Sequence, residues 1–146
     1  MAKKSMLERL AEEDLRDYQA KAQAIITLGQ QIKRYEHDFT AIRSAAADST
    51  PVSGGTNTRE DAMIDNIGTR EFLKAKQDEA KMFVRAIDTA LEVLDPRERL
   101  IIDRMYIGHT QNAVERLKAE LNLEQSQIYF YRDIAMSKFR KAYFGV

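Results

Sequence analysis

The last third of the chain carries three amphipathic helical patterns in succession, and this feature constrains the fold most strongly. The patterns cover residues 96–108, 110–121 and 124–143, and the link at 121–124 between the last two is very short. Asp before Pro at 95–96 is a strong helix start. Two helices joined by a tight turn and preceded by a third are typical of a helix-turn-helix, in which one helix projects from a small core.

The first third is one long helical pattern from about residue 5 to 47. Its apolar side chains recur at steps of three and four, which keeps them on one narrow stripe. The stripe consists of Leu15, Tyr18, Ala22, Ile25, Leu28, Ile32, Tyr35, Phe39 and Ile42. A stripe this narrow on a long helix needs a partner helix, as in a coiled coil. Gly29 interrupts it, and we expect a close approach of another segment there.

A second long pattern covers residues 59–94, with Thr58 as its expected N-cap. The Pro/Gly/Ser-rich stretch at 48–58 separates the two patterns and acts as a joint. We therefore expect an all-α protein with two domains: a helical hairpin for oligomerisation or interaction at 1–94, and a helix-turn-helix domain at 95–146. The sequence leaves open whether the two long helices pair within one chain or between chains.

Several classes of protein are disfavoured by the composition. The chain has no Cys, which excludes disulfides and thiolate metal sites and favours a reducing compartment. No apolar run reaches the length of a membrane span, and we expect a protein of the bacterial cytoplasm. His37 and His109 lie far apart without acidic residues at ligand spacing, and no nucleophile–base pair stands out. We expect no metal, no cofactor and no enzymatic activity.

The net charge is zero, but the charge is unevenly distributed. Residues 1–94 hold 14 basic and 16 acidic side chains, whereas residues 95–146 hold 9 and 7. From residue 125 onward there are four basic side chains and one acidic side chain, Asp133. The excess is small, and one copy should bind a polyanion only weakly.

The C-terminal third resembles the promoter-reading C-terminal domain of bacterial sigma factors. Residues 94–98, LDPRE, are similar to the family's LTPRE; residues 121–124, LNLE, stand at Leu-Gly-Val-Ser; and residues 135–140, AMSKFR, stand at Ala-Leu-Arg-Lys-Leu-Arg. The chain departs from this family pattern at two positions of the link at 121–124. Asn122 replaces Gly, and because Asn tolerates the left-handed conformation we expect the turn to survive. Glu124 replaces the capping Ser and would repel a nearby phosphate.

The layout of the whole chain resembles the phage ArpU-like transcriptional regulators, to which RinA-type late-gene activators are similar. These are short proteins with an N-terminal helical region, a loop like that at 51–55, and a sigma-like helix-turn-helix. The resemblance implies activation of phage late genes from double-stranded DNA of a late promoter region, with bacterial RNA polymerase as a further partner.

The third helical pattern, from about 124 to 142, is the expected DNA-reading helix. Side chains near its N-terminus reach base edges in this kind of domain, and Gln and Arg can pair with adenine and guanine. The start of the second pattern is placed for phosphates. The expected DNA contacts are Gln125, Ser126, Gln127, Tyr129 and Arg132 on bases, and Thr110, Gln111, Asn112, Arg116 and Lys138 on the backbone. We expect Tyr131 inside, Phe130 partly covered and Tyr129 outside.

Weak binding by one copy favours a homo-oligomer, most simply a dimer. Two other functions fit the same pattern. The chain could be a DNA-packaging protein similar to a terminase small subunit, whose hairpin assembles rings. It could also be a helical interaction adaptor that binds no DNA.

Overall fold

The computed structural model describes residues 3–48 and 55–146, and it leaves the side chains of 46–48 and 55–57 undescribed. Every regular element in these ranges is a helix, which confirms the all-α fold. The elements are α1 (Met6–Asp48), α2 (Gly55–Leu91), α3 (Pro96–Ile102), the π-helical turn η1 (Asp103–Ile107), α4 (Ala113–Leu121) and α5 (Gln125–Phe144). Most of the expected joint at 48–58 lies outside the described residues.

The helix boundaries depart from expectation in three places. Since α2 begins at Gly55, Thr58 lies inside the helix and the expected N-cap was wrong. The first C-terminal pattern is not one regular helix, because α3 passes into η1, where the N–H of Gly108 donates to the carbonyl of Asp103 at 2.7 Å. The third departure is α4, which begins at Ala113 rather than near Thr110.

The chain divides into two compact units. Unit 1 contains residues 1–21 and 82–146, and unit 2 contains residues 22–81. The expected division between residues 94 and 95 does not coincide with this one. The boundaries of the units fall inside the two long helices, so that the start of α1 and the end of α2 belong to the same unit as α3, α4 and α5.

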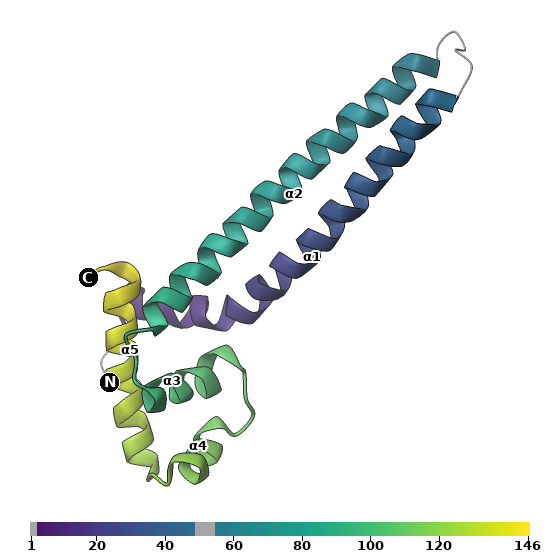
Figure 1. Ribbon diagram of the computed structural model, residues 1–146. Helices are drawn as coiled ribbons and strands as arrows, with labels where there is room; N and C mark the ends of the chain where they lie inside the picture. Colours follow the sequence, from purple (N-terminus) through teal and green to yellow (C-terminus); the bar gives the residue numbers. More distant parts are fainter. Residues whose placement is uncertain (1–2, 49–54) are drawn as a thin grey trace. The chain divides into compact units, whose positions relative to one another are not determined.

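Unit 2 is an antiparallel pair of helices within one chain (Figure 1). Gln77 Nε2 donates to the carbonyl of Ile25 at 3.1 Å, and Asn66 Nδ2 donates to the carbonyl of Tyr35 at 2.9 Å. A Cβ at Gly29 would lie 3.1 Å from Nε2 of Gln77, which confirms the expected close approach. The apolar stripe of this part of α1 therefore has its partner helix in the same chain.

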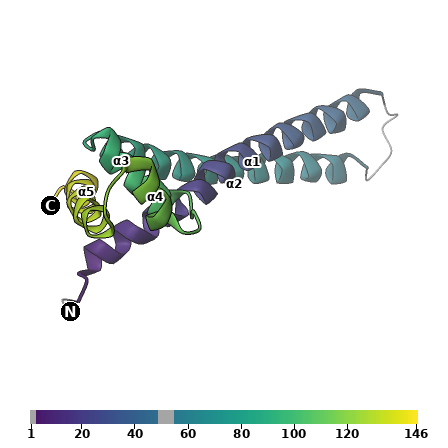
Figure 2. The same cartoon turned by 90° about the horizontal axis from the view of Figure 1, so that it is seen from below.

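Unit 1 is built on two apolar clusters. In Figure 2, as in Figure 1, the start of α1 lies beside α5. The larger cluster joins these helices to the end of α2 and to η1; it consists of Ala11, Leu15, Ile87, Ala90, Leu91, Leu94, Ile102, Tyr106, Ile107, Ala135 and Phe139. The smaller cluster joins Ile101 of α3, Leu117 of α4 and Ile128 of α5. Burial of these side chains is the main force that fixes α4 and α5 on the rest of the unit.

Candidate nucleic-acid interface

A three-residue turn joins α4 to α5. Asn122 ends α4 in the left-handed conformation, with φ 53° and ψ 47°, and its N–H donates to the carbonyl of Lys118. The N–H of Leu123 donates to the same carbonyl at 3.2 Å. Asn is one of the few side chains that tolerate this conformation. The survival of the turn without glycine is confirmed.

The start of α5 is fixed by a local hydrogen bond. The backbone N–H of Glu124 donates to Oε1 of Gln127 at 2.9 Å, which satisfies a donor that the helix leaves unpaired. Gln127 remains exposed, but its amide oxygen is engaged within the chain. Of the polar residues expected on bases, Gln125 and Ser126 are exposed beside it.

The aromatic residues of α5 differ from expectation. Ile128 is fully buried, whereas Phe130, expected to be partly covered, is 60% exposed. Tyr129 was expected outside and is half-buried, with the guanidinium of Arg132 4.8 Å from its ring centroid. Tyr131 is also half-buried, under the guanidinium of Arg97 at 3.7 Å. Phe130 is thus a large apolar group on the solvent side of the expected reading helix.

Arg132 lies on the flank of α5 rather than free in solvent. Its Nη2 and Nε donate to Oδ1 of Asp133 at 2.8 and 3.1 Å. Partial burial is the largest single effect and works against the charged form, but the hydrogen bond to Asp133 and the charge interactions with Tyr106, Asp133 and Tyr129 together outweigh it, so the pKa of Arg132 is raised. Its charge is therefore permanent and shared with one exposed carboxylate.

Lys138 has a structural partner. Its Nζ lies 2.9 Å from Oε1 of Glu98, a carboxylate that is only 2% exposed. Glu98 also accepts from the N–H of Asp95 at 3.0 Å, and Asp95 Oδ1 accepts from the N–H of Glu98 at 2.8 Å, which lowers the pKa of Asp95. This capping box at the start of α3 is visible in the sequence, but its link to Lys138 of α5 is not.

The segment before α4 takes two left-handed residues. His109 has φ 47° and Asn112 has φ 53°. The ring Nε2 of His109 lies 2.9 Å from the carbonyl oxygen of Arg16. Thr110 is half-buried, whereas Gln111 and Asn112 are exposed. The expected phosphate contacts therefore lie in a turn before α4, not in its first helical turn.

Arg116 is an expected phosphate contact without a charged partner in the described residues. It lies on α4 and its side chain is exposed.

The start of α1 packs along α5, and sequence reasoning missed this contact. Arg140 Nη1 donates to Oε1 of Glu8 at 3.1 Å, and Tyr143 Oη donates to Oδ2 of Asp14 at 2.7 Å. Burial and the hydrogen bond to Asp14 raise the pKa of Tyr143. Glu8 is also the capping partner of Ser5, whose N–H it accepts at 2.8 Å. The Ser5–Glu8 spacing was the available signal, and it marks a helix start without indicating what the helix contacts.

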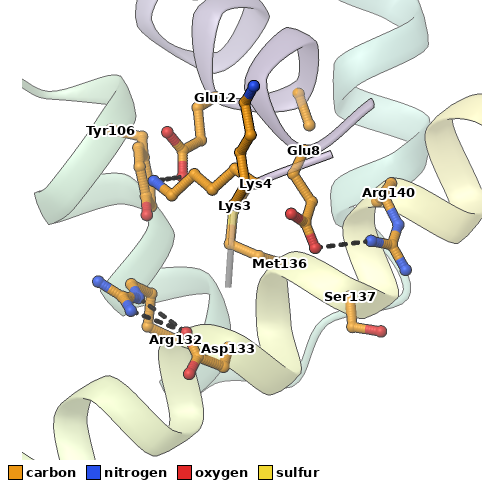
Figure 3. A pocket seen from close by; sticks show the side chains of 11 residues that line it. Lys3, Lys4, Glu8, Glu12, Tyr106, Arg132, Asp133, Met136, Ser137 and Arg140 are labelled. Carbon is orange, nitrogen blue, oxygen red and sulfur yellow. Dashed lines mark hydrogen bonds and ion pairs between the residues drawn. The ribbon is translucent and has the colours of Figure 1, made fainter. Parts of the chain in front are cut away.

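A cavity of about 400 Å³ opens between the start of α1 and α5 (Figure 3). Both basic and acidic side chains line it, together with Tyr106 and Met136. The charged lining residues are Lys3, Lys4, Glu8, Glu12, Arg132, Asp133 and Arg140. Lys3 and Lys4 therefore line the same cavity as Arg132 on the flank of α5.

Comparisons with protein-family models, curated proteins and solved structures found no match for this chain. In the described residues, no cluster of His, Asp and Glu could hold a metal ion. None of the described helices combines the length and the apolar character needed to cross a membrane.

Proposed function

We propose that the chain is a sequence-specific DNA-binding transcription regulator of the phage ArpU-like kind, and an activator of late genes. One observation carries this proposal: α4 and α5 are two helices joined by a three-residue turn at Asn122, as in a helix-turn-helix, and the first three residues of α5 are exposed. In such domains the second helix enters the major groove with its N-terminal residues against base edges.

The exposed residues of α5 suit this role. Gln125 and Ser126 offer hydrogen-bonding groups to base edges, and Phe130 one turn further along offers an apolar contact for a thymine methyl group. Arg116 on α4 is available for a phosphate. Three of the expected DNA contacts already have partners in the chain: Gln127, Arg132 and Lys138. Each of them contributes to DNA binding only if it exchanges that partner, or if it supports the reading helix.

A homo-oligomer, most simply a dimer, and contact with RNA polymerase complete the proposal. The small basic excess of residues 95–146 favours the use of two copies on DNA. In unit 2, Ile26, Ile64 and Phe72 are 55%, 65% and 59% exposed although they lie on helices that already pair with each other. Apolar groups left on such a hairpin favour a further protein partner.

Selection from a pool of random duplexes tests the DNA-binding proposal without a known target. The full chain should enrich one sequence, and Gln125→Ala and Ser126→Ala should weaken binding to the enriched duplex in fluorescence anisotropy. Lys33→Ala, an exposed change in unit 2, should leave binding unchanged.

Transcription by the host polymerase from a template with the enriched site should rise when the protein is added. Failure to enrich any sequence would overturn the proposal. A closed ring of many copies that binds DNA without an effect on transcription would favour a packaging protein instead.

A further inference from the structure

The expected reading helix carries little positive charge, and the structure offers a second source of cations next to it. Unit 1 includes residues 1–21, so the start of α1 belongs to the same compact unit as α4 and α5. We propose that Lys3 and Lys4 bind DNA phosphates alongside the Arg132 flank of α5. This inference rests on the proposed function, and it assigns a DNA contact to residues that sequence patterns place in the interaction hairpin.

The contacts between α1 and α5 progress towards the start of both helices. Asp14 of α1 accepts a hydrogen bond from Tyr143 of α5 at 2.7 Å. Glu8, which is nearer the start of α1, accepts one at 3.1 Å from Arg140, which is nearer the start of α5. Lys3 and Lys4 precede Glu8 and line one cavity together with Arg132 (Figure 3). The direction of packing thus carries the two lysines towards the N-terminal half of α5, the half proposed to enter the groove.

The residues that follow Lys3 and Lys4 anchor the start of α1 in unit 1. Ala11 and Leu15 are fully buried in the larger cluster of unit 1, and Ser5 and Glu8 cap the helix start. A cation that is positioned before binding loses less freedom when it binds a phosphate than one on a mobile tail.

The charges around the cavity leave basic groups available. Glu8 is taken by Arg140, and Asp133 is taken by Arg132. Lys4 lies 2.6 Å from Oε1 of Glu12, yet its side chain is 57% exposed. Lys3 is exposed and forms no ion pair with any residue in the described parts of the chain.

The geometry of a major groove explains why this flank matters. The groove is bordered by a phosphate backbone on each side, and a helix in it can contact both. Arg116 on α4 is the candidate for one border. On the α5 flank that carries Arg132, the start of α1 is the neighbouring element, and Lys3 and Lys4 are its cations.

The experiment compares Lys3→Ala/Lys4→Ala with Lys33→Ala/Arg34→Ala in the full chain. The control pair removes two adjacent exposed cations from the part of α1 in unit 2. Anisotropy is measured on the enriched duplex and on a scrambled duplex of equal length at several salt concentrations. Each phosphate contact lowers the slope of log K against log salt by about 0.9, so loss of both should reduce its magnitude by about 1.8. At roughly 0.1 M salt this corresponds to a loss of about eightfold for each contact.

We expect the Lys3/Lys4 variant to lose affinity for both duplexes by the same factor, and Lys3→Arg/Lys4→Arg to retain it. The Lys33/Arg34 variant should bind as wild type. Lys3→Ala alone, which keeps the ion pair of Lys4 with Glu12, separates loss of a DNA contact from any local loosening of α1, and should show about half the change in slope.

Wild-type affinity and slope in the Lys3/Lys4 variant would overturn the inference and leave the proposed function intact, provided that Gln125→Ala still weakens binding to the enriched duplex. Equal losses in the Lys3/Lys4 and Lys33/Arg34 variants would also overturn it, because the effect would then reflect net charge alone. Absence of DNA binding by the wild-type chain is a different outcome and overturns the proposed function itself.

Discussion

Replacing Leu15 by Ala tests whether the start of α1 is part of the unit that contains α4 and α5. Leu15 is fully buried in the cluster that includes Ala135 and Phe139 of α5. Leu-to-Ala changes at fully buried sites cost about 2.7–5.0 kcal/mol, since the lost transfer free energy adds to that of the cavity left behind. Leu10→Ala is the matched control: it makes the same change in the same helix, but Leu10 is 37% exposed. We expect its cost to be about 1 kcal/mol.

Hydrogen exchange followed by mass spectrometry is the assay of choice, because it reports each part of a two-unit chain separately. In Leu15→Ala, amides of α3 and α5 should exchange faster although the change lies more than 80 residues away from them in the sequence. Amides of unit 2 should change little. If α3 and α5 stay as protected as in wild type, or if Leu10→Ala has an equal effect, the assignment of residues 1–21 to this unit is wrong.

Three further predictions concern single residues. The hydrogen bond from Tyr18 Oη to Asp88 at 2.6 Å and partial burial raise the pKa of Tyr18 to about 12, with burial the larger cause. Because the folded pKa exceeds the unfolded value, this contribution to stability is complete below pH 10 and is lost as pH rises towards 12. A spectroscopic titration should show several late tyrosines, among them Tyr18 and Tyr143, and Tyr18→Phe should remove one of them; identical curves would refute this. Asn122→Gly should keep or raise the thermal midpoint, and Asn122→Ala should cost about 1 kcal/mol because of the left-handed φ; equal stability of the two would contradict the strain argument. Phe130→Ala should change stability by less than about 0.5 kcal/mol, since the ring is mostly exposed. If Phe130 contacts a thymine methyl group, replacing that thymine of the enriched site with uracil should lower the affinity of the wild-type chain about fourfold and should not lower that of Phe130→Ala. If no such replacement changes the affinity of the wild-type chain, the contact is refuted.

The helices could be predicted from the sequence because their signals are local. Asp95 and Pro96 mark the start of α3, and the periodic apolar residues of α1 predict one long helix that the structure confirms. Asn122 in the turn was also predictable, since few residues tolerate its backbone conformation. In each case, neighbours within one or two turns determine the structure.

The division of the chain could not be predicted, because a periodic stripe does not say which partner it packs against. Leu15 and Ile32 belong to the same apolar stripe of α1, yet they are buried in different units. The spacing that predicts a hairpin along the whole of α1 is equally satisfied when its first turns pack on α5.

The expected DNA contacts were only partly predictable for a similar reason. Exposure follows from helical periodicity, and Gln125 and Ser126 are exposed as that periodicity requires. The hydrogen bond that engages Gln127 and the pairing of Lys138 with buried Glu98 depend on side-chain geometry and on a contact across 40 positions of sequence.

Unit 1 is discontinuous along the chain, and this has a consequence for its folding during synthesis. Ala11 and Leu15 leave the ribosome early, but Phe139, which shares their cluster, is translated more than 120 residues later. The helical pair of unit 2 is formed by residues 22–81 alone and can form first. Completion of unit 1 must wait for α5, so an incomplete chain stopped within α4 holds a formed hairpin and an exposed apolar stretch at the start of α1. Such truncated chains are therefore open to aggregation and to recognition by chaperones.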